Sequence, residues 1–572
     1  MFPISQTNTP GGMVPGMKTV IVGGVAGGMS AATRLRRLDE KAEIVVLERS
    51  GHVSFANCGL PYYVGGVIQQ RTALLLQTPQ SLQARFGIDV RVDSEVTSID
   101  RAAKTVSVRN LGTGVEYTES YDSLVLAPGA APFVPPIPGV ERALVLRNIP
   151  DTDKMAAIVD EILAKAERER VRAAVDEDVA DTTPTAVIMG GGFIGVELAE
   201  NLTDRGLKTT IVELADQIMA PLDVEMATLV EKNLVKNGVT VITGASVTSV
   251  EADTVTLSTG QTLSASLVIA AIGVRPETGL AEAAGLELGE RGGILVDEHQ
   301  RTSDPSIYAV GDAVVKRDAL TGNQALVPLA GPANRHGRLV ADVIAGRPVA
   351  AAPVLGTAIV GAFGQIAGAT GWTEKRARAA GRNIRVIHTH PANHAGYYPG
   401  AQGMSLKLVV DADTDAILGA QGVGGVGVDK RIDVIATAMR GGITASELTD
   451  LELSYAPQFG SAKDPVNMLG YIAENLRDGL TETIQWHEVA DEVAKGVQLI
   501  DVRTPSEYAR GTVDGAVNIP VDDLRARLDE VADDVIVHCQ VGLRGYLAAR
   551  TLAQHGRHVR NLDGGYRTWA RI

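Results

Sequence analysis

The chain has 572 residues, of which 45% are hydrophobic, 21% are charged and 4% are aromatic. This composition is typical of a folded protein with several domains and excludes a generally disordered chain. The formal net charge of −15 argues against a nucleic acid partner, because binding a polyanion requires a basic surface. The two cysteines are too few for a disulfide-built scaffold or a multi-cysteine metal site.

The N-terminal segment carries no signal for export. Residues 1–17 contain Gly and Pro and no basic side chain, which predicts a flexible leader instead of a signal peptide. No apolar run approaches the roughly 20 residues that a membrane-spanning helix needs. We therefore expect a soluble, cytoplasmic protein without a membrane partner.

A dinucleotide-binding pattern begins at Lys18. A strand, a glycine-rich turn, a helix over residues 29–38 and a second strand over residues 44–47 follow one another. Glycines in such a turn let the backbone approach a pyrophosphate, which then lies on the N-terminus of the helix. Val25 departs from the pattern, because it stands where the middle glycine belongs. The dinucleotide-binding residues predicted here are Gly23, Gly24, Gly28 and Glu48, and Asp312 in a later Gly–Asp turn reaches the rest of an extended dinucleotide.

The same pattern returns, this time complete, over residues 185–216. Gly190, Gly192 and Gly195 form the full fingerprint. Glu213 follows the second strand, where an acidic residue accepts hydrogen bonds from a ribose diol and repels a 2′-phosphate. This favours NADH over NADPH, which stays the alternative. Two such folds in one chain indicate two cofactors that exchange electrons, with FAD and NADH the obvious pair.

The order of the strands predicts an α/β protein in which one Rossmann-like dinucleotide-binding domain is inserted in another. A strand that resumes the first domain ends in the Gly–Asp turn at residues 306–313. Later strands and a helix indicate an α+β domain, and a polar junction then precedes a compact α/β domain. The expected boundaries are 18–150 with 280–345 for FAD, 151–279 for NADH, 346–477 for the α+β domain and 485–572 for the last domain.

Cys58 lies in the segment SFANCGLPYY, at the entry from a strand to a helix. A thiol at a helix N-terminus has a lowered pKa and becomes a thiolate nucleophile near neutral pH. The alternative is an inert buried cysteine, and position alone leaves both open.

Together with LAPGA at residues 126–130 and SIYAVGDA at residues 306–313, this segment resembles the single-cysteine pyridine nucleotide–disulfide oxidoreductases. In particular, the chain is similar to the coenzyme A-disulfide reductases that are fused to a C-terminal rhodanese domain. The resemblance implies FAD on the first unit, NAD(P)H on the second, and a homodimer formed by the third domain. Tyr63 stands where a dithiol relative has its second cysteine, so Cys58 must form mixed disulfides or oxidised monothiol states.

The resemblance also assigns roles around Cys58. Ser54 and Asn57 would surround the sulfur, and Tyr397 and Tyr455 would come from the partner subunit, where a phenol can protonate a thiolate. Ordinary packing is the alternative for each tyrosine. The residues expected to contact coenzyme A are Lys463 and, on one face of the first helix, Arg34 and Arg37, whereas Arg36 is expected to be a solvated surface charge.

Cys539 follows an apolar run and opens a six-residue loop that ends at Arg544. Successive N–H groups of such a loop stabilise a thiolate or persulfide, and Arg544 adds positive charge. The loop resembles a rhodanese active site, although Thr512 replaces a histidine that is frequent in that family. This implies sulfur transfer through a Cys539 persulfide, and an inactive docking module is the alternative.

Three histidines, His388, His390 and His394, are spaced closely enough to suggest a metal site. The strand-like pattern between them and the lack of a carboxylate partner argue against one, so no metal is expected.

The sequence therefore predicts an NADH-driven, FAD-containing reductase of coenzyme A persulfide, polysulfide or coenzyme A disulfide, coupled to a sulfurtransferase domain. Whether coenzyme A is a substrate or a tightly held arm stays open. One alternative is an NADH oxidase or peroxidase in which Cys58 cycles through a sulfenic acid. The other is a redox flavoprotein whose rhodanese domain only docks partners.

Overall fold

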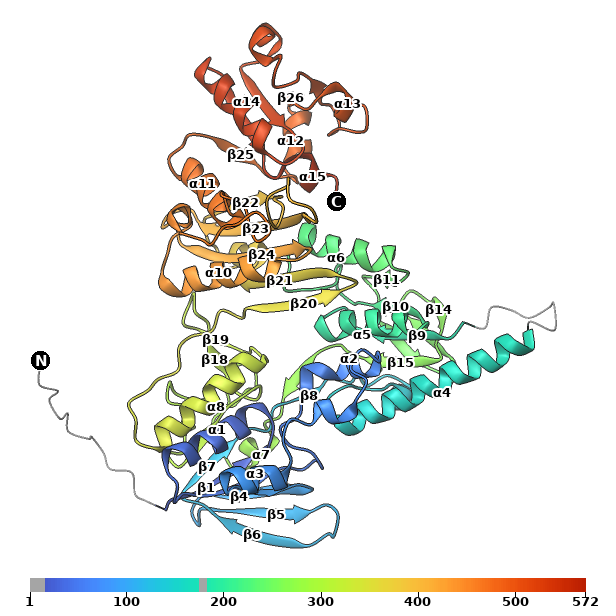
Figure 1. The fold of residues 1–572 in the computed structure, drawn as a ribbon, viewed down its shortest axis with the longest axis vertical. Helices are drawn as coiled ribbons and strands as arrows, with labels where there is room; N and C mark the ends of the chain where they lie inside the picture. Colours follow the sequence, from blue (N-terminus) through green and yellow to red (C-terminus); the bar gives the residue numbers. More distant parts are fainter. Residues whose placement is uncertain (1–15, 174–182, 572) are drawn as a thin grey trace, which may run out of the picture. The chain divides into compact units, whose positions relative to one another are not determined.

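The computed structural model describes residues 16–173 and 183–571 (Figure 1). Its contacts divide it into two compact units. Unit 1 consists of the residues up to 214 and of 245–354, and unit 2 consists of 215–244 and the residues from 355 on. Most of the leader predicted at residues 1–17 lies outside the described residues. Within the described parts of the chain, no helix is long and apolar enough to cross a membrane.

Unit 1 contains a five-stranded parallel sheet with the order β17-β7-β1-β2-β3. Its strands are β1 (Lys18–Val22), β2 (Glu43–Leu47), β3 (Asp89–Arg91), β7 (Ser123–Leu126) and β17 (Ile307–Ala309). The edge strand β17 comes after the second dinucleotide-binding fold in the chain. The first sheet is therefore completed by residues that follow that inserted fold. β7 is buried along its whole length, as is typical of a parallel sheet covered on both faces.

Helix α1 (Ala26–Leu38) packs against α8 (Ala330–Ile344) beside this sheet. The sequence predicted that α1 begins at residue 29, whereas the helix starts three residues earlier. Gly28 therefore lies in the first turn of α1, where a Cβ would lie 1.9 Å from the oxygen of Gly23, whereas Gly23 and Gly24 precede the helix.

The second dinucleotide-binding fold, also in unit 1, has three parallel strands side by side in the order β10-β9-β15. They are β9 (Thr185–Met189), β10 (Lys208–Val212) and β15 (Leu267–Ala270), with α5 (Phe193–Asp204) between the first two. The other elements of unit 1 are α2 (Leu60–Val64), α3 (Pro79–Phe86), β4 (Ser94–Asp100), β5 (Thr105–Asn110), β6 (Glu116–Ser120), β8 (Ala130–Pro132), α4 (Ile149–Ala173), β12 (Val247–Val250), β13 (Thr254–Leu257), β14 (Thr262–Ser264), β16 (Val274–Pro276), α7 (Gly279–Ala283), β18 (Lys316–Arg317) and β19 (Gln324–Ala325).

Unit 2 contains a five-stranded antiparallel sheet with the order β20-β21-β24-β23-β22. Its strands are β20 (Ala358–Ala362), β21 (Gln365–Gly371), β22 (Ile384–Thr389), β23 (Met404–Asp411) and β24 (Ile417–Gly424). β23 is buried at every residue, so both faces of the sheet are covered at this strand. The helices around the sheet are α6 (Val224–Lys236), α9 (Glu374–Ala379), α10 (Val428–Gly441) and α11 (Pro465–Arg477). Strand β11 (Thr240–Ile242) follows α6 in the chain and is not part of this sheet.

The C-terminal part of unit 2 is a parallel sheet with the order β25-β29-β28-β26-β27. Its strands are β25 (Glu482–Ile484), β26 (Gln498–Asp501), β27 (Val517–Asn518), β28 (Asp534–His538) and β29 (His558–Leu562). β25 begins inside the segment that the sequence predicted as a polar junction. The helices here are α12 (Val489–Ala494), α13 (Pro505–Tyr508), α14 (Leu543–Gln554) and α15 (Gly565–Trp569).

Candidate active sites

The first dinucleotide turn joins β1 to α1. Gly23 has φ +101°, a left-handed conformation that favours glycine. Glu48 accepts hydrogen bonds from the N–H groups of Gly24 (2.7 Å) and Ser50 (2.8 Å), which ties the turn to the end of β2. Val25 caps α1 without a side-chain hydrogen bond, so the N–H groups of the first helical turn stay available for a diphosphate.

Asp312 follows β17 and has a buried Oδ1 atom with no hydrogen-bond partner among the described residues. Burial raises the pKa of its carboxyl group, although the cations of Lys316 and Arg147 act in the opposite direction. A buried acceptor without a partner suits a hydroxyl group of a bound ligand. The turn, the uncapped helix and this oxygen therefore fit an extended dinucleotide such as FAD.

The second turn, between β9 and α5, repeats this design. Gly190 has φ +107°, and a Cβ at Gly195 would lie 2.1 Å from the oxygen of Gly190. A Cβ at Gly192 would meet nothing within 4 Å, so the space above this glycine can receive a ligand. Glu213 accepts the N–H of Gly191 at 2.8 Å and is thereby held at the turn. These residues fit the pyrophosphate and ribose of a pyridine nucleotide.

Cys58 lies in a single 3₁₀ turn (Asn57–Gly59) that leads into α2. Cys58 is exposed, but desolvation by the surrounding protein raises the pKa of its thiol, and the carboxylates of Glu197 and Asp312 raise it further. The predicted lowering of this pKa by a helix N-terminus is therefore wrong for the chain as described. α2 has only five residues, and its weak dipole does not outweigh two carboxylates.

The segment before Cys58 is anchored on the first dinucleotide turn. Ser54 adopts φ +47° and donates its N–H to the oxygen of Gly24 at 2.9 Å. With its amide group turned to satisfy both atoms, Asn57 accepts from the Arg147 guanidinium and donates to the Arg147 oxygen, both at 2.8 Å. Ser54 thus ties this segment to the first dinucleotide turn, and Asn57 ties it to Arg147.

The three arginines of α1 differ in what they contact. Arg34 forms an ion pair with Asp342 at 2.7 Å, so its charge is neutralised within unit 1 instead of being left for a phosphate. Arg37 is exposed. Arg36 was predicted to be a solvated surface charge, but its guanidinium donates to the backbone oxygens of Phe86 (2.6 Å) and other residues.

Unit 2 brings Tyr397 and Tyr455 together. Their hydroxyl groups lie 3.0 Å apart, and this hydrogen bond raises the pKa of Tyr397. Both rings are exposed, and Lys463 is exposed as well. The pair is therefore a surface feature and not part of the core, which disfavours ordinary packing as its role.

Cys539 is fully buried at the end of β28. The N–H of Gly542 points at its sulfur, with 3.2 Å between nitrogen and Sγ. Gly542 has φ +98° and caps α14, so the loop curls its amide back onto the thiol. An N–H aimed at sulfur stabilises an anionic thiolate or persulfide.

Arg544 donates two hydrogen bonds of 2.7 Å to Glu507. This pair lowers the pKa of Glu507 to about 2, so the carboxylate is ionised at neutral pH. Cys539 also contributes to the raised pKa of Arg544. The positive charge that Arg544 was predicted to add to the loop is therefore paired with the Glu507 carboxylate, which was not predicted from the sequence. Thr512, in place of the frequent histidine, donates to Asp501 at 2.7 Å.

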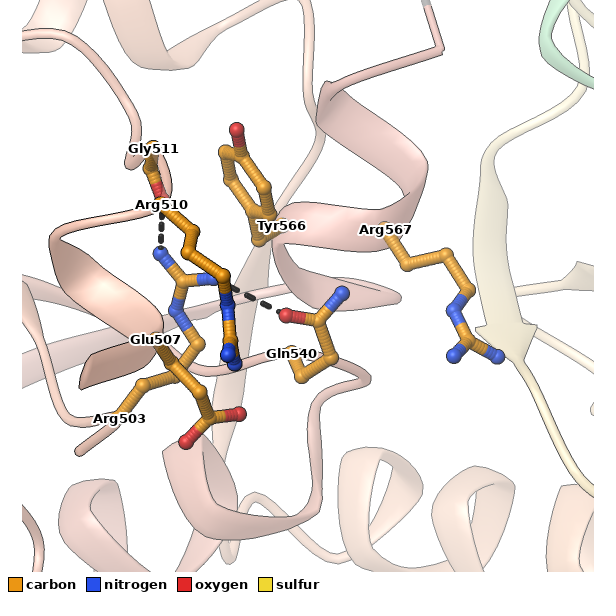
Figure 2. A pocket seen from close by; sticks show the side chains of 7 residues that line it. All are labelled: Arg503, Glu507, Arg510, Gly511, Gln540, Tyr566 and Arg567. Atoms are coloured by element: carbon orange, nitrogen blue, oxygen red, sulfur yellow. Dashed lines mark hydrogen bonds between the residues drawn. The ribbon is translucent and has the colours of Figure 1, made fainter.

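A pocket of about 390 Å³ lies beside the Cys539 loop (Figure 2). Arg503 stacks on the Tyr566 ring at 4.3 Å and donates to the Gln540 side chain at 3.0 Å. Arg510 and Arg567 are exposed at its rim. None of these three arginines was predicted from the sequence, although Arg503 stands only two residues after the end of β26. The lining residues are Arg503, Glu507, Arg510, Gly511, Gln540, Tyr566 and Arg567.

His388 has carboxylate partners after all, contrary to the argument from sequence. Its ring nitrogens lie 3.0 Å from Glu225 and 2.6 Å from Asp563. Asp223, Glu225 and Glu374 lie close enough together to hold a metal ion, but the Lys407 ammonium lies among them. This group is an ion-pair cluster.

Comparison with known families covers most of the chain. The pyridine nucleotide-disulphide oxidoreductase family matches residues 17–337, its dimerisation domain matches residues 358–465, and the rhodanese-like domain matches residues 485–572. The first of these matches alone spans more than half of the chain. The chain belongs to the pyridine nucleotide-disulphide oxidoreductase family.

Three relatives of the oxidoreductase illustrate the resemblance. The coenzyme A disulfide reductase of Staphylococcus haemolyticus (strain JCSC1435) is 32% identical over 460 residues, which are 80% of this chain and all of that protein. The structure of reduced Bacillus anthracis CoADR-RHD has a TM-score of 0.93 at 46% identity, covering 97% of this chain and 98% of that chain. An NAD-dependent persulfide reductase from A. fulgidus has a TM-score of 0.87 at 37% identity, covering 97% and 100%.

These matches confirm the family resemblance, the fold class and the enzyme class that the sequence predicted. The oxidoreductase is a flavoprotein with FAD and NADH as cofactors, and it carries a rhodanese-like domain.

Proposed function

We propose that the oxidoreductase cleaves the sulfur–sulfur bond of coenzyme A persulfide, polysulfide or coenzyme A disulfide, and that its C-terminal domain supplies the sulfur of the persulfide. One observation carries the proposal: each of the two cysteines lies in a site built around it. Cys58 is anchored on the first dinucleotide turn, and Cys539 receives an N–H from its loop. Two of the relatives are named for coenzyme A disulfide and persulfide reduction.

In the reductive half, the Cys58 thiolate attacks the inner sulfur of a persulfide R–S–S–H. A Cys58–S–S–R disulfide forms, the original S–S bond breaks, and the outer sulfur leaves as hydrosulfide. Bound FAD supplies two electrons taken from NADH. These electrons restore the Cys58 thiolate and release R–S⁻, which takes up a proton. The sum is R–S–S–H plus NADH giving R–S–H, HS⁻ and NAD⁺.

The proton is assigned to the hydroxyl pair of Tyr397 and Tyr455, which the family resemblance places at the thiol of the partner subunit. Their exposure and mutual hydrogen bond support this assignment. It requires a homodimer, for which the match to the dimerisation domain speaks. Light scattering of the purified protein tests the dimer, and a monomer that retains full activity would remove this role.

In the sulfur-transfer half, the Cys539 thiolate attacks the outer sulfur of a donor such as thiosulfate. A Cys539–S–S⁻ persulfide forms, and sulfite leaves. A carrier thiolate then takes the outer sulfur and restores Cys539. The N–H of Gly542 stabilises the anionic sulfur, and the exposed cations of Arg510 and Arg567 beside the pocket attract anionic donors and carriers.

A phosphorylated thiol such as coenzyme A is the proposed carrier, because it has a long arm and an anionic head. Arg37 and Lys463 are exposed cations that suit its phosphates, whereas the paired Arg34 is not proposed to bind them. Mass spectrometry of the purified protein distinguishes a tightly held coenzyme A from one that exchanges as a substrate. Because both thiols are free and must stay reduced, a reducing compartment such as the cytoplasm is the proposed location.

Two serine variants test the proposal. Cys58→Ser is expected to abolish NADH-driven hydrosulfide release from coenzyme A persulfide and to leave thiosulfate:cyanide sulfur transfer intact. Cys539→Ser is expected to do the reverse. If Cys58→Ser turned over coenzyme A persulfide at the wild-type rate, the reductive half of the proposal would be wrong.

The two alternative functions, a peroxidase and a flavoprotein with a docking module, predict different experimental results. In stopped-flow reoxidation of the NADH-reduced protein, hydrogen peroxide reacting faster than coenzyme A persulfide would identify a peroxidase that uses a Cys58 sulfenic acid. Unchanged thiosulfate:cyanide transfer in Cys539→Ser would instead leave the rhodanese-like domain a docking module.

A further inference from the structure

A buried charged cluster lies within unit 2, apart from both cysteine sites. Lys407 on β23 is fully buried, and its ammonium contacts Asp223 (3.0 Å), Glu374 (2.7 Å) and Glu225. Burying a cation is costly unless carboxylates surround it, and here three do so. They come from α6 or the residue before it and from α9, so this cluster holds two helices on the antiparallel sheet.

His388 on β22 extends the cluster toward the rhodanese-like domain. Nε2 lies 3.0 Å from Glu225, and Nδ1 lies 2.6 Å from Asp563. The backbone N–H of His388 also lies 3.0 Å from both Asp563 oxygens. Because each ring nitrogen faces a carboxylate oxygen, the ring satisfies both contacts only when it carries both protons.

Asp563 is the first residue of a five-residue strap that ends at Arg567 (residues 563–567). Gly564 and Gly565 have φ of +67° and +63°. A Cβ at Gly564 would lie 2.8 Å from Cβ of His388, whereas a Cβ at Gly565 would lie 2.5 Å from the oxygen of Cys539. The two glycines are therefore pressed between the histidine on one side and the sulfur-transfer loop on the other.

The far end of the strap holds the Cys539 loop directly. The N–H of Tyr566 donates to the oxygen of Cys539 at 2.8 Å, and the N–H of Arg567 donates to the oxygen of Gln540 at 3.0 Å. The side chains of Tyr566 and Arg567 also line the pocket of Figure 2. A displacement of Asp563 therefore moves both the loop that carries the thiol and the wall of its pocket.

We propose that His388 is a positioning residue for sulfur transfer, which it serves by holding Asp563 and thereby the strap that fixes the Cys539 loop. This inference rests on the proposed sulfurtransferase function. It explains how His388, which lies outside the rhodanese-like domain, can affect sulfur transfer at Cys539 without touching the substrate. It also means that the domain needs the antiparallel sheet for full activity.

The charge on His388 adds a pH dependence. Asp563 and Glu225 raise the pKa of His388 to about 9 against the opposing effects of burial and of Lys407. The imidazolium is therefore present at neutral pH and is lost as the pH rises through about 9, which weakens the hold on Asp563. The charged groups that act on His388 are Asp563 of the strap, Glu225 of α6 and Lys407 of β23. Around them, Asp223 and Glu374 face Lys407, and His390 faces His388, Arg567 and Arg571.

The test compares His388→Gln with His394→Gln in the full-length protein loaded with FAD. His394 is buried in the same part of unit 2, but the contact of its ring nitrogen is to the oxygen of Ala395 and not to the strap. The assay is sulfur transfer from thiosulfate to cyanide. We expect kcat to fall about tenfold in His388→Gln, equivalent to about 1.4 kcal/mol, and to stay within twofold in His394→Gln.

The pH profile separates positioning from a general structural role. The wild-type rate should fall above about pH 9, and His388→Gln should lack this alkaline limb. Deprotonation of a thiol or of hydrogen cyanide raises the rate with pH, so neither produces the expected decline. Asp563→Asn, which keeps the acceptor oxygen but removes the charge, should behave like His388→Gln and serves if the histidine variant does not fold.

Each outcome bears on one proposal. Equal kcat and identical pH profiles in wild type and His388→Gln would overturn the positioning role. Loss of NADH-driven persulfide reduction along with sulfur transfer in both histidine variants would overturn it as well, because the effect would then not be local to the loop. By contrast, wild-type sulfur transfer that survives Cys539→Ser would refute the proposed function. Amide hydrogen exchange at Tyr566 and Arg567, expected to be about tenfold faster in His388→Gln only, would then still test the strap.

Discussion

Replacing Gly565 by alanine should disable sulfur transfer far more than it destabilises the protein. Gly565 has φ +63°, and an L-residue in that conformation costs about 1–2 kcal/mol. The added Cβ would also lie 2.5 Å from the oxygen of Cys539, whereas ordinary contact begins at 3.4 Å. The loop must therefore retreat by roughly 1 Å, and a misplacement of that size costs about 10²-fold in rate.

Gly556 offers a matched control in the same domain. Its φ is +81°, and a Cβ there would meet nothing within 4 Å, so Gly556→Ala brings the backbone strain without the clash. The assay is thiosulfate:cyanide transfer together with thermal unfolding of both variants. Gly565→Ala should lose about 10²-fold in kcat, and Gly556→Ala should keep its rate within about twofold. Equal rates in the two variants would refute the claim that the strap bears on the Cys539 loop.

Glu197→Gln removes a negative charge near Cys58 and should lower the pKa of that thiol, measured by the pH dependence of its alkylation; an unchanged or higher pKa would contradict the assignment. Lys407→Met leaves three buried carboxylates without their cation and should cost about 3–5 kcal/mol in the free energy of unfolding, and a loss below about 1 kcal/mol in denaturant titration would speak against the cluster. Because its folded-state pKa is raised to about 9, His388 should contribute stability that is fully present below about pH 6.5 and lost through pH 9, which thermal unfolding against pH checks. Gly28→Ala places a Cβ 1.9 Å from a backbone oxygen of the first turn and should abolish FAD retention, so a variant with full flavin absorbance would exclude this cofactor site.

The dinucleotide turns and the Cys539 loop were predictable because each is built from contiguous residues. In the second dinucleotide turn, Gly190 and Gly195 are five positions apart, and the close approach between them depends only on a strand, a turn and a helix in succession. The Cys539 loop is equally local, since the amide that points at its sulfur belongs to Gly542. The roles assigned to these residues in catalysis stay predictions.

The charge environment of the same residues was not predictable in this way. Glu197 raises the pKa of Cys58 from α5, and Asp342 neutralises Arg34 from α8. The end of a helix or an exposed position can be predicted from neighbouring residues in the sequence. An ion pair instead depends on which residues from distant strands or helices come to lie within a few ångströms of each other.

His388 shows both what the local sequence predicts and what only the tertiary structure decides. Its place on a strand follows from the local pattern, whereas its carboxylate partners stand 163 and 175 residues away in the chain. Backbone geometry is encoded by residues that are adjacent in sequence, and so the amino acids alone specify the turns, the elements and the positions of both thiols. Electrostatic energy falls with distance in space and not along the chain, and so the pKa of Cys58, the pairing of Arg34 and the strap behind Cys539 emerge only when the domains have packed.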